Sequence, residues 1–297
     1  MARNAGIALL CKSISNFQIC ARSFGTGSMK LQNNLISTLD SKTGIAEVKM
    51  NKAPVNSLNT DFIKQLSQTI KDLENTKGCR GLILTSNVPN IFSAGLDIME
   101  MYQSTPERMS EFWGSFQQFW MDLYGSKLAT IAAINGHAPA GGCLMAMSCD
   151  YRIMASGKYT IGLNETLLGI VAPLWLQGTM EKTIGHRVTE LSLQLGKLYS
   201  AEEALKIGLV DEIVAKPEDT IQKAQSELIS KWLKIPDIAR QITKKNLRQD
   251  FIAHLQKMRE ADIKQFVAFA SNDKTQKALG MYLESLKKRS KFLDIIL

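Results

Sequence analysis

The sequence has few of the residues that bind metal ions and lacks the glycine-rich loops that bind nucleotides. Its five cysteines and three histidines include no C-x-x-C pair and no H-E-x-x-H motif. We therefore expect no structural or catalytic zinc site. The patterns G-x-G-x-x-G and G-x-x-x-x-G-K-S/T are also missing, which argues against the common dinucleotide and nucleoside triphosphate sites.

Long hydrophobic runs are missing as well. The longest nearly uninterrupted apolar stretch, residues 128–134, is far shorter than the ~20 residues that span a bilayer. Hydrophobic residues make up 45% of the 297 residues and charged residues 22%, a composition typical of a folded globular protein. We expect a soluble protein with no membrane span.

Acidic residues are absent before Asp40, whereas Arg3, Lys12, Arg22 and Lys30 precede it. Residues 1–28 also contain serines and are mildly amphipathic, as mitochondrial transit peptides are. We predict that residues 1–28 are a transit peptide and that the protein resides in the mitochondrial matrix. A disordered native tail is the alternative interpretation.

The remaining positive charge is too small to favour nucleic acid. Omitting the four basic residues before Asp40 reduces the net charge from +8 to +4, with 32 basic against 28 acidic residues. No run of five or six basic residues accompanies this surplus, so we expect no nucleic-acid partner.

Strand and helix patterns alternate in the first two thirds of the chain, and helices dominate the rest. Strands are expected within residues 31–50 and at 80–85, 128–135, 151–154 and 159–162, with helices at 59–78, 107–124 and 143–149. A capping box, Ser200 with Glu203, predicts a helix over 201–207. Further helices are expected at 217–233, 236–247, 251–269 and 274–288. We predict an α/β core at 29–215 and a helical region at 216–297.

Three segments carry residues suited to one reaction. Ser93-Ala94-Gly95-Leu96-Asp97 and Pro139-Ala140-Gly141-Gly142-Cys143 are turns of small residues before helices, where N–H groups can form an oxyanion hole. The third segment contains Glu165, a lone carboxylate between apolar neighbours and glycines. A glutamate withdrawn from water suits general acid–base catalysis near neutral pH. Taken separately, each segment could instead be an ordinary turn or a surface glutamate.

In this order, the three segments resemble the crotonase, or enoyl-CoA hydratase/isomerase, superfamily. The resemblance extends over residues 44–288 and includes Pro54-Val55-Asn56-Ser57-Leu58. Its most specific element, Asn-Glu-Thr before Leu-Leu-Gly-Ile-Val-Ala-Pro, is similar to the Δ3,Δ2-enoyl-CoA isomerases of that superfamily. The resemblance implies a spiral of ββα units with C-terminal helices that trimerise, giving a homotrimer or a hexamer. It also implies an acyl-CoA thioester substrate and no metal or redox cofactor.

The resemblance further implies roles for individual residues. Glu165 would be the catalytic acid/base that shifts the double bond of 3-enoyl-CoA to trans-2-enoyl-CoA during β-oxidation, and Ala94 and Gly141 would supply the oxyanion-hole N–H groups. The residues that would bind substrate are Ala94, Gly95, Leu96, Asp97, Ile98, Gly141 and Asn164.

One departure separates reactions within the superfamily. Hydratases carry a second glutamate at the position of Leu144, so a one-base isomerase is favoured here. His137 is expected to be a turn or core histidine and not a substitute base. An enoyl-CoA hydratase, a dienoyl-CoA isomerase and a non-catalytic RNA-binding member remain alternatives. Phe266, Phe269 and Tyr282 are expected either at the trimer interface or in the core of the chain.

Overall fold

The computed structural model describes residues 29–32 and 34–296, and the side chains of residues 34–284. The predicted transit peptide therefore lies outside the described residues. The strands are β1 Met29–Gln32, β2 Leu35–Asp40, β3 Ile45–Met50, β4 Gly81–Ser86, β5 Ala129–Ile134, β6 Ala138–Pro139, β7 Tyr151–Ala155, β8 Ile161–Gly162 and β9 Glu212–Val214. The α-helices are α1 Thr60–Asn75, α2 Pro106–Tyr124, α3 Gly141–Ser148, α4 Leu174–Ile184, α5 His186–Leu195, α6 Ala201–Lys206, α7 Asp219–Ser230, α8 Asp237–Ala270 and α9 Asp273–Ile296.

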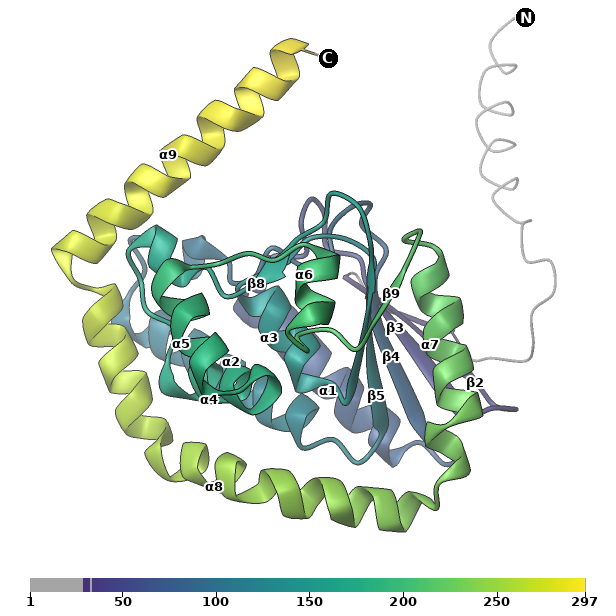
Figure 1. Ribbon diagram of the computed structural model, residues 1–297. Helices are drawn as coiled ribbons and strands as arrows, with labels where there is room; N and C mark the ends of the chain where they lie inside the picture. The colour runs from purple at the N-terminus through teal and green to yellow at the C-terminus, as the bar shows by residue number, and fades with distance from the viewer. Residues whose placement is uncertain (1–28, 33, 297) are drawn as a thin grey trace, which may run out of the picture.

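Seven strands form the main sheet, in the order β1-β2-β3-β4-β5-β7-β9. The β1-β2 and β2-β3 pairs are antiparallel, and every pair from β3 onward is parallel. Because parallel strands need crossover connections, helices lie on the faces of this sheet (Figure 1). The sequence predicted this α/β arrangement correctly.

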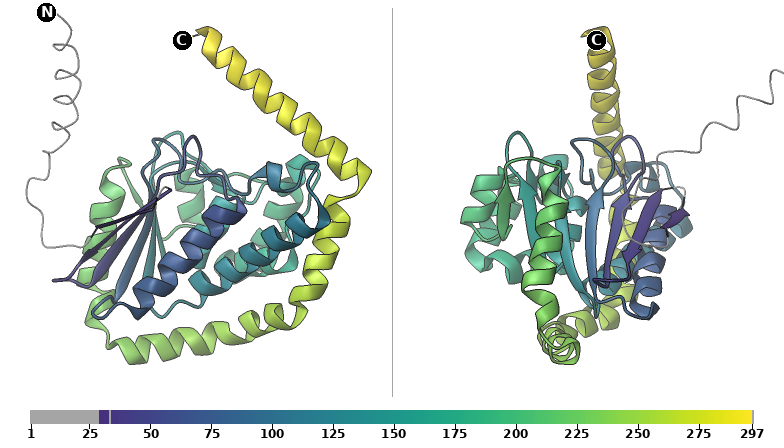
Figure 2. Two further views of the ribbon diagram at one scale, coloured as in Figure 1. Left: turned by 180° about the vertical axis from the view of Figure 1, so that it is seen from behind. Right: turned by 90° about the vertical axis from the view of Figure 1, so that its right-hand side faces the viewer.

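Alternate residues of the buried strands face two different cores. On β4, Leu82 and Leu84 join the large core under α1 and α2, whereas Ile83 joins a smaller core with Ala224 and Leu228 of α7. A period of two places successive side chains on opposite faces. One helix of the C-terminal region, α7, thus covers a face of the main sheet and is not a separate layer (Figure 2).

A second, smaller set of pairings lies beside the main sheet and links the ends of its strands. Here β6 pairs in parallel with β8, and isolated bridges join Leu58 with Leu96 and Ile91 with His137. Each long strand from β3 to β7 is followed by one of these short paired segments and then by a helical element. This repeated strand–bridge–helix unit produces the ββα spiral.

Local sequence signals fix several helix boundaries. The Asn59 side chain caps α1 by accepting from the Phe62 N–H, and the Thr105 side chain caps α2 ahead of Pro106. In the predicted capping box, the Ser200 N–H donates to the Glu203 carboxylate and the Glu203 N–H donates to Ser200 Oγ. The helix opened by Ser200 is therefore confirmed.

The C-terminal helices differ from the prediction at one point. Residues 236–247 and 251–269 were expected to form two helices, but both belong to the continuous helix α8. Residues 248–250 are Arg-Gln-Asp, which include no helix breaker, and polar residues alone do not end a helix.

Buried charges hold the first half of α8 against the core. Lys244 Nζ lies 2.5 Å from Asp150 Oδ2, and Arg248 lies 3.1 Å from Asp150 Oδ1. The Asp150 side chain is only 5% exposed and also accepts the Thr130 N–H. This carboxylate bridges the start of β5 to α8, which runs along the edge of the molecule and then turns into α9 (Figures 1 and 2).

None of the helices within residues 29–32 and 34–296 combines the length and the apolar character that crossing a membrane requires.

Candidate active site

The two small-residue turns meet in direct backbone contact. Gly95 has φ +87°, and a Cβ on it would lie 2.8 Å from the Gly141 nitrogen. A Cβ on Gly142 would lie 2.4 Å from the Ser93 carbonyl oxygen. Any side chain at either position would separate the segments, so the contact requires glycine. The two segments that could supply oxyanion-hole N–H groups therefore lie side by side.

Two N–H groups at this contact have no acceptor within the described part of the chain. One belongs to Leu96, which packs next to Gly141: a Cβ placed on Gly141 would lie 3.4 Å from the Leu96 nitrogen. The other belongs to Gly141 at the start of α3, where the first N–H groups of a helix lack intrahelical partners. Neighbouring N–H groups of this kind can stabilise negative charge on one oxygen.

Ala94 does not fit the donor role predicted for it. Its N–H already donates to the Val55 carbonyl oxygen at 2.9 Å. The bridge between Leu58 and Leu96 uses the Leu58 and Asp97 N–H groups, which leaves the Leu96 N–H free. The geometry therefore favours Leu96 over Ala94 as the partner of Gly141.

Hydrogen bonds hold the start of α3 in a strained backbone conformation. Ala140, the residue before Gly141, has φ 50° and ψ −120°, a conformation that non-glycine residues rarely adopt. Its N–H donates to the Gly162 carbonyl oxygen, and its own carbonyl oxygen accepts the Leu144 N–H. These bonds lock the turn that exposes the Gly141 N–H.

Residues 94–98 contribute alternately to a cavity. Ala94, Leu96 and Ile98 line it, whereas Gly95 and Asp97 do not. The Asp97 carboxylate accepts hydrogen bonds from Ser57 Oγ and from the Met99 N–H, and it lies 3.7 Å from Lys52 Nζ. Asp97 therefore stabilises the segment through contacts outside the cavity, whereas its neighbours Leu96 and Ile98 line the cavity.

Glu165 lies at the wall of the same cavity and is 9% exposed. Burial raises the pKa of its carboxyl group to about 7, because the charged form loses hydration. Its Oε2 atom is buried and has no hydrogen-bond partner among the described residues. An unpaired carboxylate oxygen with a pKa near neutrality is suited to accept and return a proton.

Asn164 also lines the cavity, and its Oδ1 is buried without a partner in the described chain. The backbone around both residues is a single turn of 3₁₀ helix, Glu165–Leu168, that ends at Gly169 in the left-handed conformation.

Cys143 of α3 is fully buried, and burial raises the pKa of its thiol, with the nearby charge of Glu165 acting in the same direction.

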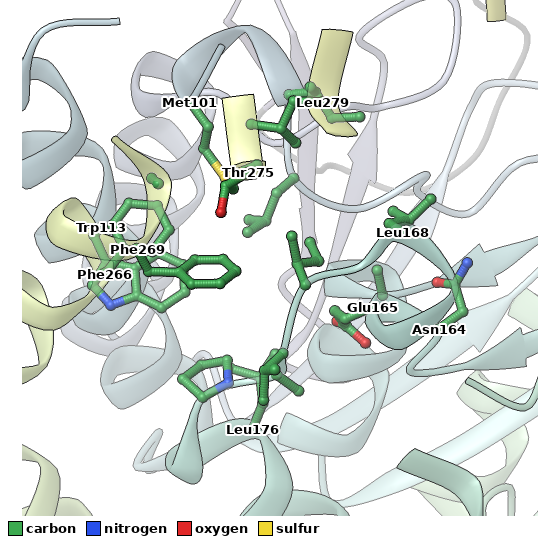
Figure 3. Close-up of a pocket in the computed structure, with 18 of the residues that line it drawn as sticks. Met101, Trp113, Asn164, Glu165, Leu168, Leu176, Phe266, Phe269, Thr275 and Leu279 are labelled. Atoms are coloured by element: carbon green, nitrogen blue, oxygen red, sulfur yellow. The ribbon is translucent and has the colours of Figure 1, made fainter. Parts of the chain in front are cut away.

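The cavity has a volume of about 480 Å³ and a mostly apolar lining. Figure 3 shows Glu165 and Asn164 on one side and Trp113, Phe266 and Phe269 on the other. Phe266 stacks on Trp113 with ring centroids 3.8 Å apart, and Tyr282 of α9 contributes to the lining as well. The three aromatic residues left open by the sequence analysis thus lie within the chain's own pocket.

Leu144 and His137 do not line this cavity. Leu144 is fully buried in α3. The ring of His137 packs edge-on against Tyr159, and its Nδ1 lies 3.2 Å from the Thr160 N–H. Burial and the charge of Lys158 lower the pKa of His137. The structure gives His137 a role in the turn between β5 and β6.

Supporting contacts that the sequence analysis missed hold the 93–96 segment. Asn56, fully buried with φ 50°, donates through Nδ2 to Ser86 Oγ and to the Phe92 carbonyl oxygen. Ser93 Oγ donates to the Asn56 carbonyl oxygen and accepts the Gly95 N–H. The motif around Asn56 contributes to the family resemblance, but its contacts become evident only in three dimensions.

Across the side chains that the structure describes, no three His, Cys, Asp or Glu residues are grouped so that they could hold a metal ion.

Comparisons with known proteins agree with this geometry. A family model described as enoyl-CoA hydratase/isomerase matches residues 40–292. Enoyl-CoA delta isomerase 1, mitochondrial, from Rattus norvegicus is 52% identical over 251 residues, which cover 84% of this chain and 86% of that protein. The Homo sapiens protein of the same name is 48% identical over 250 residues, covering 84% and 82%.

A solved structure extends the agreement to three dimensions. The crystal structure of human mitochondrial delta3-delta2-enoyl-CoA isomerase matches with a TM-score of 0.85 and 46% sequence identity. The match covers 86% of this chain and 99% of that one.

Proposed function

Since the chain belongs to the enoyl-CoA hydratase/isomerase family, we propose that it catalyses the isomerisation of 3-enoyl-CoA to trans-2-enoyl-CoA in the β-oxidation of unsaturated fatty acids. Relatives about half identical to it carry isomerase names. That similarity favours an enzyme over a non-catalytic RNA-binding protein.

The reaction needs one base and one oxyanion site. Glu165 Oε2 removes a proton from C2, and the electrons of that C–H bond pass into a dienolate. Negative charge then develops on the thioester oxygen, where the Leu96 and Gly141 N–H groups donate to it. Protonated Glu165 returns the proton to C4, which leaves the double bond between C2 and C3. No atom is gained or lost.

One observation carries the proposal: Glu165, whose buried Oε2 atom has no hydrogen-bond partner among the described residues, lines the same cavity as Leu96 and Ala140. The unpaired N–H groups of Leu96 and Gly141 lie at the contact between those two segments. Such N–H groups are preorganised for the charge of the intermediate, and removing one donor of this kind commonly reduces the rate about 10²–10³-fold.

The position of Leu144 separates this reaction from hydration. Adding water across the 2,3 double bond by the two-carboxylate route requires a second acid/base group, and Leu144 is apolar and buried. The other carboxylate that lines the cavity, Asp262, is hydrogen-bonded to Trp113, which lies across the cavity from Glu165 (Figure 3).

The decisive experiment incubates purified protein with 3-enoyl-CoA and follows the absorbance of conjugated 2-enoyl-CoA. We expect its appearance without added metal or redox cofactor. A parallel incubation with 2-enoyl-CoA measures water addition as loss of the same absorbance. Hydration as fast as isomerisation would show that the protein is a hydratase.

The cellular setting is also a proposal. The relatives are named mitochondrial, and the basic, acid-free residues 1–28 support import into the matrix. We also propose a homotrimer, which the exposed apolar side chains of Leu167, Val171 and Leu195 support as an interface.

We expect residues 1–28, fused to a fluorescent reporter, to direct it into mitochondria. Replacing Arg3, Lys12 and Arg22 by Glu should abolish import, because import depends on a basic amphipathic segment. The measurement is co-localisation with a matrix marker, and diffuse fluorescence from the unmodified fusion would contradict the proposal.

A further inference from the structure

One face of α8 forms the wall of the cavity opposite Glu165. The α8 residues that line the cavity follow helical spacing: Asp262, Gln265, Phe266, Phe269 and Ala270. In Figure 3, Trp113, Phe266 and Phe269 lie across the open space from Glu165. Most of this wall is aromatic or aliphatic, so the carboxylate of Asp262 is its exceptional member.

Three N–H donors converge on a single oxygen of Asp262. Trp113 Nε1 and Gln117 Nε2 each lie 2.7 Å from Oδ2, and Trp175 Nε1 lies 3.3 Å from it. Trp113 and Trp175 are buried and pack edge to face. The carboxylate is therefore fixed in orientation by α2 and α4, the two helices that face it.

The other oxygen, Oδ1, has no hydrogen-bond partner in the described part of the chain. Oδ1 is not fully buried, so this oxygen remains accessible. Among the side chains of residues 34–284, no lysine or arginine forms an ion pair with Asp262. Nearby Arg259 donates instead to Gln118 Oε1 and to the Gly114 carbonyl oxygen. Asp262 thus lines the apolar cavity without a counter-ion among the described side chains.

From this arrangement we propose that Asp262 is a specificity-determining residue, which excludes acyl chains that end in a carboxylate and admits chains that end in a methyl group. The proposal rests on the proposed function, because it takes the cavity as the site of the acyl chain. With the thioester oxygen at Leu96 and Gly141 and C2–C4 beside Glu165, a long chain continues toward the α8 wall.

The discrimination follows from electrostatics. A methyl terminus carries no charge and packs against Phe266 and Phe269. A terminal carboxylate that reaches the same wall loses hydration and meets a fixed like charge in surroundings of low polarity. Like charges about 6 Å apart in such surroundings change an equilibrium by roughly 10–100-fold. Chains too short to reach α8 should escape this penalty.

The test compares pairs of 3-enoyl-CoA substrates of equal length, one ending in methyl and one in carboxylate, from hexenoyl to tetradecenoyl. The readout is the ratio of kcat/KM for the two members of each pair. For the wild-type protein, we expect the ratio to favour the methyl substrate increasingly with length. Asp262→Asn keeps an oxygen for the three donors but removes the charge, and it should reduce this ratio at least tenfold for the long pair.

Two further variants complete the test. Glu260→Gln removes an exposed carboxylate of α8 that does not line the cavity, and it should leave the ratio unchanged. Gln265→Lys places a positive charge on the cavity face without altering the contacts of Asp262. It should also reduce the ratio for the long pair, even if Asp262→Asn fails to fold.

The outcomes separate the two proposals. If the wild-type protein does not turn over any methyl-terminated substrate, the proposed function is wrong. If it does, but Asp262→Asn or Gln265→Lys folds and keeps the wild-type ratio at every length, the role of Asp262 is wrong. The role of Asp262 is also wrong if Glu260→Gln changes the kcat/KM ratio as much as Asp262→Asn does, because the effect would then come from surface charge in general.

Discussion

At the scale of single residues, the burial that prepares Glu165 for catalysis also weakens folding. Its carboxyl group has a pKa of about 7 in the folded chain, against an ordinary value of 4.5. Below pH 4.5 the group is protonated in both the folded and the unfolded states. Between pH 4.5 and about 7 only the unfolded chain releases this proton. The free energy of unfolding therefore falls as pH rises through this range and stays constant above about pH 7.

The first prediction concerns the pH dependence of activity. Because Glu165 must be ionised to remove the C2 proton, kcat/KM should rise about tenfold per pH unit below pH 7 and level off above it. The measurement is the initial rate at low 3-enoyl-CoA concentration across this range. A rate independent of pH between 5 and 8 would contradict the assignment of Glu165 as base.

Replacing Glu165 by Gln tests the same assignment directly. Gln keeps the size and the hydrogen-bonding capacity but cannot accept the proton, and positioned bases contribute about 10²–10⁴-fold. We expect kcat to fall at least a hundredfold while binding of a saturated acyl-CoA, measured by calorimetry, is retained. A variant with nearly wild-type turnover would refute the role of Glu165.

The second prediction is that Glu165→Gln stabilises the fold at high pH. The wild-type protein loses free energy of unfolding between pH 4.5 and about 7, and the variant does not. The difference should reach the order of 3 kcal/mol above pH 7 and vanish near pH 4.5. Urea unfolding at pH 5 and pH 8 measures it, and an equal difference at both values would contradict the linkage.

The sequence predicted part of this site. Glu165 stood out because a charged residue lies between apolar residues and glycines. The choice of Ala94 over Leu96 was wrong, because backbone N–H groups are alike in sequence and only the pairing of Ala94 with Val55 distinguishes them. Asp262 was missed for a related reason: on α8 it is one acidic residue among many polar ones, and its three donors come from distant helices.

At the scale of elements, the observed strands and helices lie close to the ranges predicted from the sequence wherever hydrophobic periodicity and capping residues agreed. The helix at Thr60–Asn75 has both an Asn59 cap and a buried face. The exception was α8, which was divided in two although no glycine or proline interrupts it. Its contacts explain its path: ion pairs in its first half and the aromatic wall in its second hold it against the core.

The third prediction concerns the docking of α8. Asp150→Asn leaves Lys244 and Arg248 facing each other without a counter-charge, and breaking a buried pair of this kind costs about 3–5 kcal/mol. The midpoint of urea unfolding should shift down accordingly. Glu111→Gln, which breaks the exposed pair with Lys64, serves as control and should leave the midpoint nearly unchanged. Equal shifts in the two variants would contradict the proposed docking.

At the scale of the whole molecule, the sequence could not reveal which surfaces lie close together. Leu167 and Val171 lie four residues apart, Leu195 ends α5, and each of the three is about two-thirds exposed. A Cβ on Gly196 would lie 2.7 Å from the Leu167 side chain, which places the end of α5 beside residues 165–168. Together these residues form an apolar surface next to the candidate active site, and exposed apolar patches commonly mark interfaces.

The last prediction assigns this surface to the proposed trimer. Wild-type protein should sediment as a trimer at micromolar concentration. The double variant Leu167→Glu/Leu195→Glu should sediment as a monomer, because it places two negative charges from each chain in an apolar contact. Neither residue lines the cavity, so lost assembly is separable from lost substrate contacts. Ile229→Glu, an exposed apolar residue of α7, is the matched control and should remain trimeric. A double variant that still forms trimers would place the interface elsewhere, and a monomeric wild-type protein would refute the trimer itself.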